Sequence, residues 1–366
     1  MKKDRMTLVA MLVIALLAIT MLAGCGGSKK EAAKSEPQKT EQTQGEKKIK
    51  IGLSMDTLKE ERWQRDRDMF VAKANELGAE VLVQAANGDD ALQISQAENL
   101  ISQGVDILVV IPHNAEAAAT IVESAHKAKI PVIAYDRLIK NSDVDLYISF
   151  DNVKVGEMQA KYITNLVPKG NYVLIGGAPT DNNALLFRQG QMNVLKPLVD
   201  KGDIKILADP FSNDWKPEEA LKHMENALTQ FKNKVDAVVA SNDGTAGGTI
   251  QALAEQKLAG KVPVSGQDAE IAAMQRIVEG TQAMTVYKPI KDIANKAAEV
   301  AAAMAKGQNP QPNSKVNNGK IDVPSILLEP IAVDKKNVYD TVVKDGFHAL
   351  EDVYKNVPKE QWPAQK

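Results

Sequence analysis

The stretch IKIGLSMDTLKEERWQRDRDMFVAKANELGAEVLVQ, residues 49–84, contains the pattern that decides the fold. A short apolar run, a turn, a long helical stretch and a second apolar run follow one another. Apolar strands that alternate with helices in this way are typical of parallel β-sheets covered by helices. The same pattern recurs to about residue 265, and it predicts a doubly wound α/β sheet that is built twice.

The predicted strands are continuously apolar, which indicates that both faces of each strand are buried. They lie at residues 49–54, 80–84, 107–111, 132–135, 146–150, 172–175, 204–208, 237–240 and 263–265. Amphipathic helices are predicted between them, for example at 91–103 and at 218–231, where Pro217 precedes the helix. A body of about 300 residues exceeds one ordinary core and suits two domains.

The N-terminus predicts export. Lys2, Lys3 and Arg5 precede an apolar run at 6–23, and the run ends in Ala-Gly before Cys25, the one cysteine of the chain. This arrangement resembles a bacterial lipobox, so we expect residues 1–24 to be a lipoprotein signal peptide and Cys25 to carry the lipid. A membrane-spanning helix is the alternative, because about 18 apolar residues could just cross a bilayer.

Residues 25–47 are rich in Lys, Glu, Gln and Ser and lack core-forming side chains. Such a segment cannot bury enough apolar surface to offset its ordering entropy, so we expect a flexible tether. The protein would then be extracytoplasmic and lipid-anchored to the cell membrane.

Composition and motifs disfavour several functions. The net charge is −2, so there is no basic excess for nucleic acid. The four histidines, at 113, 126, 223 and 348, are too far apart in sequence to indicate a metal site. The motifs G-x-G-x-x-G, G-x-x-x-x-G-K-[ST], G-x-S-x-G and H-E-x-x-H are missing, so we expect no cofactor and no catalytic residues.

Polar residues cluster directly after five of the predicted strands. Because ligands bind at the carboxyl ends of strands in open α/β sheets, the clusters predict one shared cleft. Each cluster taken alone could instead be a helix N-cap. The clusters are Asp136-Arg137, Asp151-Asn152, Asp181-Asn182-Asn183, Asn242-Asp243 and Gln267-Asp268.

Paired carboxylates could in principle serve glycoside hydrolysis, for which Asp136, Asp181 and Asp268 are candidates. Each has an Arg, Asn or Gln close by in sequence. Such neighbours favour ionised hydrogen-bond acceptors over an acid with a raised pKa. A binding site is therefore the simpler interpretation.

Several longer runs resemble the D-xylose-binding proteins of ABC sugar importers, which belong to the pentose and hexose group of periplasmic binding proteins. The resemblance extends from Lys48 to about His348. The runs are ERWQRDRD (61–68), VQAANGDD (83–90), AYDR (134–137), ISFDN (148–152), GGAPTDNNALLFRQGQM (176–192), VVASNDGTAGGTIQAL (238–253), SGQDAE (265–270) and TVYKPI (285–290).

The resemblance implies a clamp of the type I periplasmic-binding-protein kind, with a sugar held between two lobes. The sugar faces would fall to Trp63 and Trp215, since an indole covers the apolar C–H face of a pyranose. Asp151-Asn152 would lie at a hinge. Groups that accept from or donate to hydroxyls would hold the sugar rim, namely Arg62, Asp136, Arg137, Asp181, Asn183, Asn242, Asp268 and Lys288.

The resemblance also implies lobe boundaries and partners. The first lobe would comprise 48–150 and 269–311, and the second 151–268 and 312–355, joined by three crossings; 356–366 would be a tail. We expect a monomer that delivers D-xylose, or a closely related pyranose, to an ABC permease. A sugar sensor that signals to a receptor or histidine kinase remains an alternative, and so does a glycosidase-like enzyme.

Overall fold

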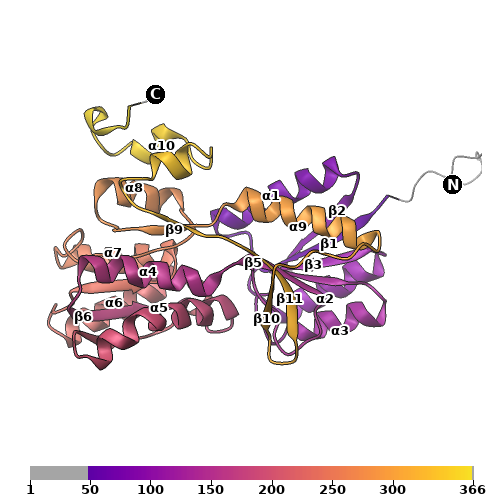
Figure 1. Ribbon diagram of the computed structural model, residues 1–366, viewed down its shortest axis with the longest axis horizontal. Coiled ribbons are helices and arrows are strands. Elements are labelled where there is room, and N and C mark those ends of the chain that lie inside the picture. Colours follow the sequence, from indigo (N-terminus) through magenta and orange to yellow (C-terminus); the bar gives the residue numbers. More distant parts are fainter. Residues whose placement is uncertain (1–47, 365–366) are drawn as a thin grey trace, which may run out of the picture. The chain divides into compact units, whose positions relative to one another are not determined.

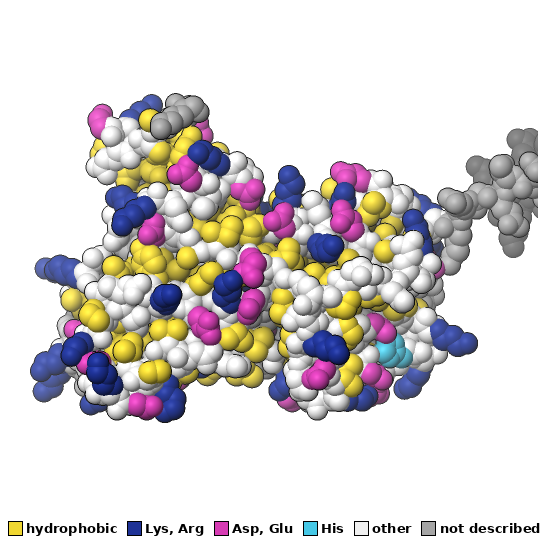
Figure 2. Space-filling model, viewed as in Figure 1, with side chains coloured by type: hydrophobic (Ala, Val, Ile, Leu, Met, Phe, Trp, Pro, Cys, Tyr) yellow, Lys and Arg dark blue, Asp and Glu magenta, His cyan; other side chains and the backbone are white. Residues whose placement is uncertain are grey.

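The computed structural model describes residues 48–364, which fall within one compact unit at Lys47–Lys366. The signal peptide, the lipidated Cys25 and the tether predicted for 1–47 lie outside the described residues. Of the helices within 48–364, none is both long enough and apolar enough to cross a membrane. On the face shown in Figure 2, basic and acidic side chains are interspersed.

A seven-stranded sheet organises the first lobe (Figure 1), with the strand order β10-β11-β5-β4-β3-β1-β2. Its pairs are parallel except for the antiparallel pair β10 and β11. The strands are β1 (Lys50–Met55), β2 (Glu80–Ala85), β3 (Ile107–Val110), β4 (Val132–Tyr135), β5 (Leu146–Phe150), β10 (Ser314–Asn317) and β11 (Asp322–Leu328).

Helices cover both faces of this sheet, so the lobe has two cores. On one face α1 (Glu61–Glu76) packs against α9 (Ile290–Ala305), and Phe70 and Ile293 belong to that core. On the other face α2 (Asp90–Ser102) and α3 (Ala119–Lys127) bury Leu100 and Ile121. Because both faces are covered, the central strands β3, β4 and β5 are buried along their whole length, as their apolar sequences predicted.

The second lobe repeats this arrangement on a smaller scale. A parallel sheet in the order β7-β6-β8 has two helices on each face. Its elements are β6 (Gly170–Ile175), β7 (Ile204–Ala208), β8 (Ala237–Ala240), α4 (Asn152–Leu166), α5 (Asn182–Asp200), α6 (Pro217–Gln230), α7 (Asp243–Glu255) and the short η1 (Asn213–Trp215). The doubly wound fold predicted from the sequence is therefore confirmed.

The C-terminal part of the chain completes the second lobe. An antiparallel pair, β9 and β12, lies beside a core that joins α8 to the segment after residue 337. These elements are α8 (Ile271–Glu279), β9 (Thr285–Tyr287), β12 (Ile331–Val333), η2 (Tyr339–Val343), α10 (Leu350–Tyr354) and η3 (Lys359–Gln361).

Three details differ from the sequence prediction. Residues 263–265 form no regular strand, only an isolated parallel bridge between Val264 and Val238. Residues 314–328, assigned to the second lobe, join the first-lobe sheet because β11 pairs with β5. Residues 271–287, assigned to the first lobe, pack in the second, where the N–H groups of Ala283 and Val286 donate to Val264 and Gly266.

The chain passes between the two sets of elements at three places, near residues 151, 289 and 330. The sequence analysis also predicted three crossings, but it placed the last two at about residues 269 and 312. In both lobes the helices follow the carboxyl ends of parallel strands, so the strand-end loops of each lobe gather at one edge of its sheet.

Candidate functional site

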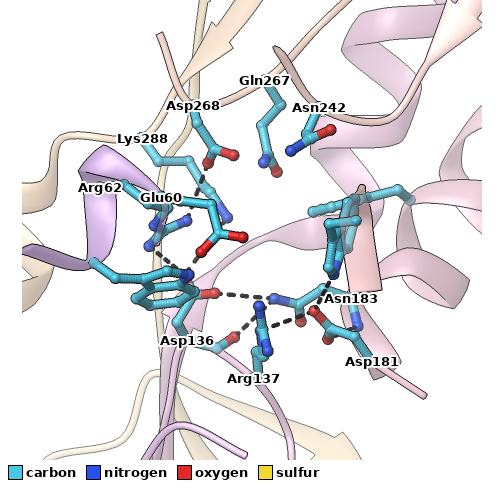
Figure 3. A pocket seen from close by; sticks show the side chains of 13 residues that line it. Glu60, Arg62, Asp136, Arg137, Asp181, Asn183, Asn242, Gln267, Asp268 and Lys288 are labelled. Carbon is cyan, nitrogen blue, oxygen red and sulfur yellow. Dashed lines mark hydrogen bonds and ion pairs between the residues drawn. The ribbon is translucent and has the colours of Figure 1, made fainter. Parts of the chain in front are cut away.

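Thirteen side chains from both lobes line one pocket (Figure 3). All ten residues that the sequence analysis proposed as ligand contacts are among them. The remaining three are Glu60, Phe187 and Gln267. The ten are Arg62, Trp63, Asp136, Arg137, Asp181, Asn183, Trp215, Asn242, Asp268 and Lys288.

The first lobe contributes two neighbouring segments. Arg62 and Trp63 lie in the first turn of α1, which begins directly after the carboxyl end of β1. Asp136 and Arg137 follow β4, and Asp136 has a φ of 59°, a left-handed conformation that non-glycine residues seldom adopt. Asp136 is nevertheless 1% exposed, so the surrounding structure holds this conformation in place.

In the second lobe, two of the predicted contact residues are also helix caps. Asp181 is the N-cap of α5, where its side chain accepts from the N–H of Asn183. Asn242 is the N-cap of α7 and forms a capping box with Thr245. Both caps also line the pocket, so a side chain that caps the N-terminus of a helix can face into the pocket at the same time.

The loop residues of the second lobe have unusual backbones. Trp215, in η1, has a φ of 58°, and Asp268, in the turn before α8, has a φ of 98°. Lys288 follows β9 and is 2% exposed. The positive φ values of Trp215 and Asp268 indicate backbone strain. Such strain is often found at functional sites, where the surrounding contacts must hold it.

Arg62 connects two carboxylates of the pocket. Its guanidinium donates to Asp136 and to Asp268, each at 3.0 Å, and lies 3.4 Å from Asp66. Lys288 adds a second cation 3.5 Å from Asp136. Burial alone would raise the pKa of Asp136, but Arg62, Lys288 and Arg137 outweigh burial and hold this pKa well below its ordinary value.

Arg137 organises the opposite side of the pocket. Its Nε lies 2.9 Å from Asp181, and its Nη1 lies 2.7 Å from Asp56. Asp181 also accepts from the indole N–H of Trp215 at 3.1 Å. Burial raises the pKa of Asp181 even though Arg137 opposes the shift. This carboxylate therefore positions both a cation and an aromatic wall.

Aromatic rings form the apolar walls. Trp63 lies under the guanidinium groups of Arg62 and Arg137, and it also belongs to the first-lobe core, which the sequence analysis did not expect. Trp215 packs edge-on against Phe187, with 6.2 Å between ring centroids. A Cβ at Gly177 would come within 2.0 Å of the Trp215 ring, so glycine is required at this position.

The pocket chemistry matches a neutral polyhydroxylated molecule. Its charged lining residues are Glu60, Asp136, Asp181 and Asp268 against Arg62, Arg137 and Lys288, which is four negative and three positive groups. Paired charges of this kind leave no excess positive charge for a phosphate or carboxylate. Hydroxyl groups can donate to the carboxylates and accept from the cations. Within residues 48–364 no group of three or more His, Cys, Asp or Glu residues is arranged to hold a metal ion.

Three lining residues were missed by the sequence analysis. Gln267 belongs to a strand-end cluster that was noticed, but only its neighbour Asp268 was chosen. Phe187 lies in α5, where an apolar residue is indistinguishable from a core residue by sequence. Glu60 precedes α1 in a run of charged residues that is typical of a solvated surface.

Comparison with known proteins gives a consistent result. Residues 51–309 match the family model described as periplasmic binding protein domain. The chain is 58% identical over 308 residues to the D-xylose-binding periplasmic protein of Haemophilus influenzae, covering 84% of this chain and 93% of that protein. It is 59% identical over 302 residues to the protein of the same name from Escherichia coli, covering 82% and 92%.

Solved structures agree with these sequence matches. A carbohydrate transporter solute-binding protein from Chloroflexus aurantiacus, in complex with D-glucose, has a TM-score of 0.80 and 32% identity. That match covers 84% of this chain and 98% of the other. An ABC transporter solute-binding protein from Clostridium phytofermentans with bound β-D-glucose has a TM-score of 0.78 and 33% identity, with 83% and 99% covered.

Proposed function

This chain belongs to the periplasmic binding protein family, and from that premise we propose that it binds D-xylose, or a closely related pyranose, outside the cytoplasm and delivers the sugar to an ABC permease. The observation that carries the proposal is the composition of the pocket. Four carboxylates, three cations and two indoles surround one space. The identity of 58–59% to two D-xylose-binding proteins supports xylose in particular.

Each part of the pocket would recognise a different part of a pyranose. Trp63 and Trp215 would cover its C–H faces and exclude water. The eight polar residues predicted as rim contacts would hydrogen-bond to the hydroxyl groups and the ring oxygen. Since the lining residues come from both lobes, a ligand that contacts both would favour the arrangement in which the lobes approach each other.

The lipid anchor is part of the proposal. Lipidation of Cys25 would keep the protein at the membrane that holds the permease, and residues 26–47 would act as a tether. A monomer would be sufficient, because one chain supplies all thirteen lining residues.

Calorimetric titration tests the proposal. The ligands should be D-xylose, D-glucose, D-ribose, L-arabinose, xylo-oligosaccharides and, as a charged control, D-xylonate. We expect the tightest binding for xylose and no measurable binding for xylonate, because its carboxylate would face the pocket's four acidic groups. Binding to none of the neutral sugars would contradict the proposal.

Two further measurements address the alternatives. Xylose uptake that is lost in a deletion strain would support transport, and normal uptake with a lost transcriptional response would favour sensing. Incubation with aryl xylosides should release no product if the protein is a binding protein.

A further inference from the structure

Glu60 occupies an unusual position at the edge of the pocket. It precedes α1 at the N-cap position, but its side chain makes no capping hydrogen bond. Its carboxylate instead lines the pocket. Figure 3 shows this carboxylate pointing into the space between Asp268 and Arg137, which come from different lobes.

The other three carboxylates of the pocket are satisfied by protein donors. Asp136 accepts from Arg62 and Asn183, and Asp268 accepts from Arg62. Asp181 accepts from the Trp215 indole and the Asn183 N–H, and it is paired with Arg137. Protein donors therefore hold these three groups in place before any ligand is considered.

Glu60 differs from them. Its Oε2 is buried and has no hydrogen-bond partner among the described residues. A buried acceptor without a donor costs about 1–3 kcal/mol, and more when it is charged. Burial accordingly raises the pKa of Glu60, although Arg137 opposes the shift. A donor that enters the pocket would remove this cost.

Gln267 places a second acceptor of this kind in the same pocket. Its Oε1 is also buried and without a partner in the described part of the chain. Gln267 lies before α8 in the second lobe, whereas Glu60 lies in the first. The two acceptors belong to the residues that the sequence analysis did not select, so they are additional to the ten predicted contacts.

We propose that Glu60 is a specificity-determining residue, which accepts a hydrogen bond from one hydroxyl group of the bound sugar. The inference rests on the proposed function, since it assumes a sugar in this pocket. A site built to accept a hydroxyl hydrogen rejects an analogue without it, because the acceptor is then left buried and unsatisfied. Glu60 would thus select among neutral sugars by one hydroxyl position.

The test is a set of thermodynamic cycles between protein and ligand. The proteins are the parent, Glu60→Gln and Glu60→Leu, each titrated with D-xylose and with its four monodeoxy analogues. A hydrogen bond to a charged group corresponds to about 10- to 150-fold in affinity. We expect one analogue to lose affinity in that range with the parent and less than about threefold with Glu60→Leu.

Two variants keep the cycles interpretable. Glu60→Gln retains the shape and one acceptor oxygen, so it should bind xylose more tightly than Glu60→Leu does. Asp68→Asn, in α1, likewise removes one negative charge, but the Asp68 side chain is 67% exposed and outside the pocket, so this control should bind like the parent. Thermal unfolding of each variant checks that it is folded, and if Glu60→Leu is unfolded, Glu60→Ala, which also lacks an acceptor, takes its place in the cycles.

The possible outcomes separate this inference from the proposed function. If the parent binds xylose and all four deoxy penalties persist in the folded variant that lacks an acceptor at position 60, the role of Glu60 is wrong and the proposed function stands. If the parent binds none of the sugars, both fail. A penalty that disappears for a single deoxy position identifies the hydroxyl that Glu60 accepts.

Discussion

The imidazole Nε2 of His348 lies 2.7 Å from the carbonyl oxygen of Ala269, the residue after Asp268. The turn at Asp268 and Ala269 is strained, since both residues have positive φ values, of 98° and 53°. A residue near the C-terminus thus supports the turn that presents a pocket carboxylate. Arg65, one turn after Arg62 in α1, donates to the carbonyl of Phe347 and lies 3.4 Å from His348 Nδ1.

Replacement of His348 should therefore weaken sugar binding indirectly. His348→Ala removes one neutral hydrogen bond, worth about 0.5–1.5 kcal/mol, so we expect about 2- to 12-fold weaker binding of xylose. In an Asp268→Ala background the same change should cause no further loss, because the turn no longer carries the carboxylate. Calorimetric titration of the four proteins measures this coupling. Equal losses in both backgrounds would show that His348 does not act through Asp268.

Replacement of Asp268 should weaken xylose binding more than replacement of His348 does. Asp268→Ala removes a charged acceptor from the proposed sugar rim, and we expect about a 10- to 150-fold loss of affinity for xylose. Asp268→Asn is the matched variant, because Asn tolerates a positive φ better than Ala does. If Asp268→Ala binds xylose as tightly as the parent, the carboxylate does not contact the sugar.

Trp215 should affect affinity without changing stereochemical preference. Trp215→Ala removes a large apolar surface, worth about 1.5–3 kcal/mol, so binding of every pyranose should weaken by about 10- to 150-fold. The ratio of affinities for xylose and its epimers should stay within about threefold, since an indole contacts C–H faces and not the hydroxyl rim. A large change in that ratio would mean that Trp215 orients a polar group, for example Asp181, which accepts from its indole N–H.

The ion pair of His113 with Asp56 should make stability depend on pH. The hydrogen bond to Asp56 raises the pKa of His113 above its ordinary 6.5, although burial opposes the shift. His113 therefore stabilises the fold below about pH 6.5, and this contribution is lost as the pH rises through its pKa in the folded protein. His113→Gln should lower the free energy of unfolding in urea more at pH 6 than at pH 9. In an Asp56→Asn background the difference should shrink, and an equal loss at both pH values would contradict this assignment.

Cys25 should determine where the mature protein is found. Because residues 22–25 read Leu-Ala-Gly-Cys after an apolar run, Cys25→Ser should release the protein from membranes or block its processing. Fractionation followed by immunoblotting measures the distribution. Mass spectrometry of the membrane-extracted parent is the complementary measurement, and an unmodified Cys25 would exclude the anchor.

Much of the site could be predicted from the sequence because strand ends can be recognised locally. Apolar runs indicate where the parallel strands end, and topology brings those ends to one edge of a sheet. Strand ends identified the clusters that contain Asp136, Asp181, Asn242 and Asp268, and the family resemblance then assigned these residues to the sugar rim; all four line the pocket. That they contact a sugar remains a prediction.

Contacts between distant segments could not be predicted in the same way. The pairing of β11 with β5 joins residues almost 180 positions apart, and no local pattern shows which lobe β11 enters. The same reason explains Phe187, whose spacing in α5 fits a core residue as well as a pocket wall. His348 was considered only as one of four scattered histidines, although it contacts Ala269.

The sequence by itself determined the alternation of strands and helices and the kind of side chain after each strand, because neighbouring residues encode both through periodicity and turn chemistry. Only the tertiary structure decided which of these side chains are already paired. Arg62 is held by Asp136 and Asp268, whereas Glu60 Oε2 has no partner among the described residues. Such pairing depends on distances and burial between segments that are far apart in the chain, and residue order alone does not specify them.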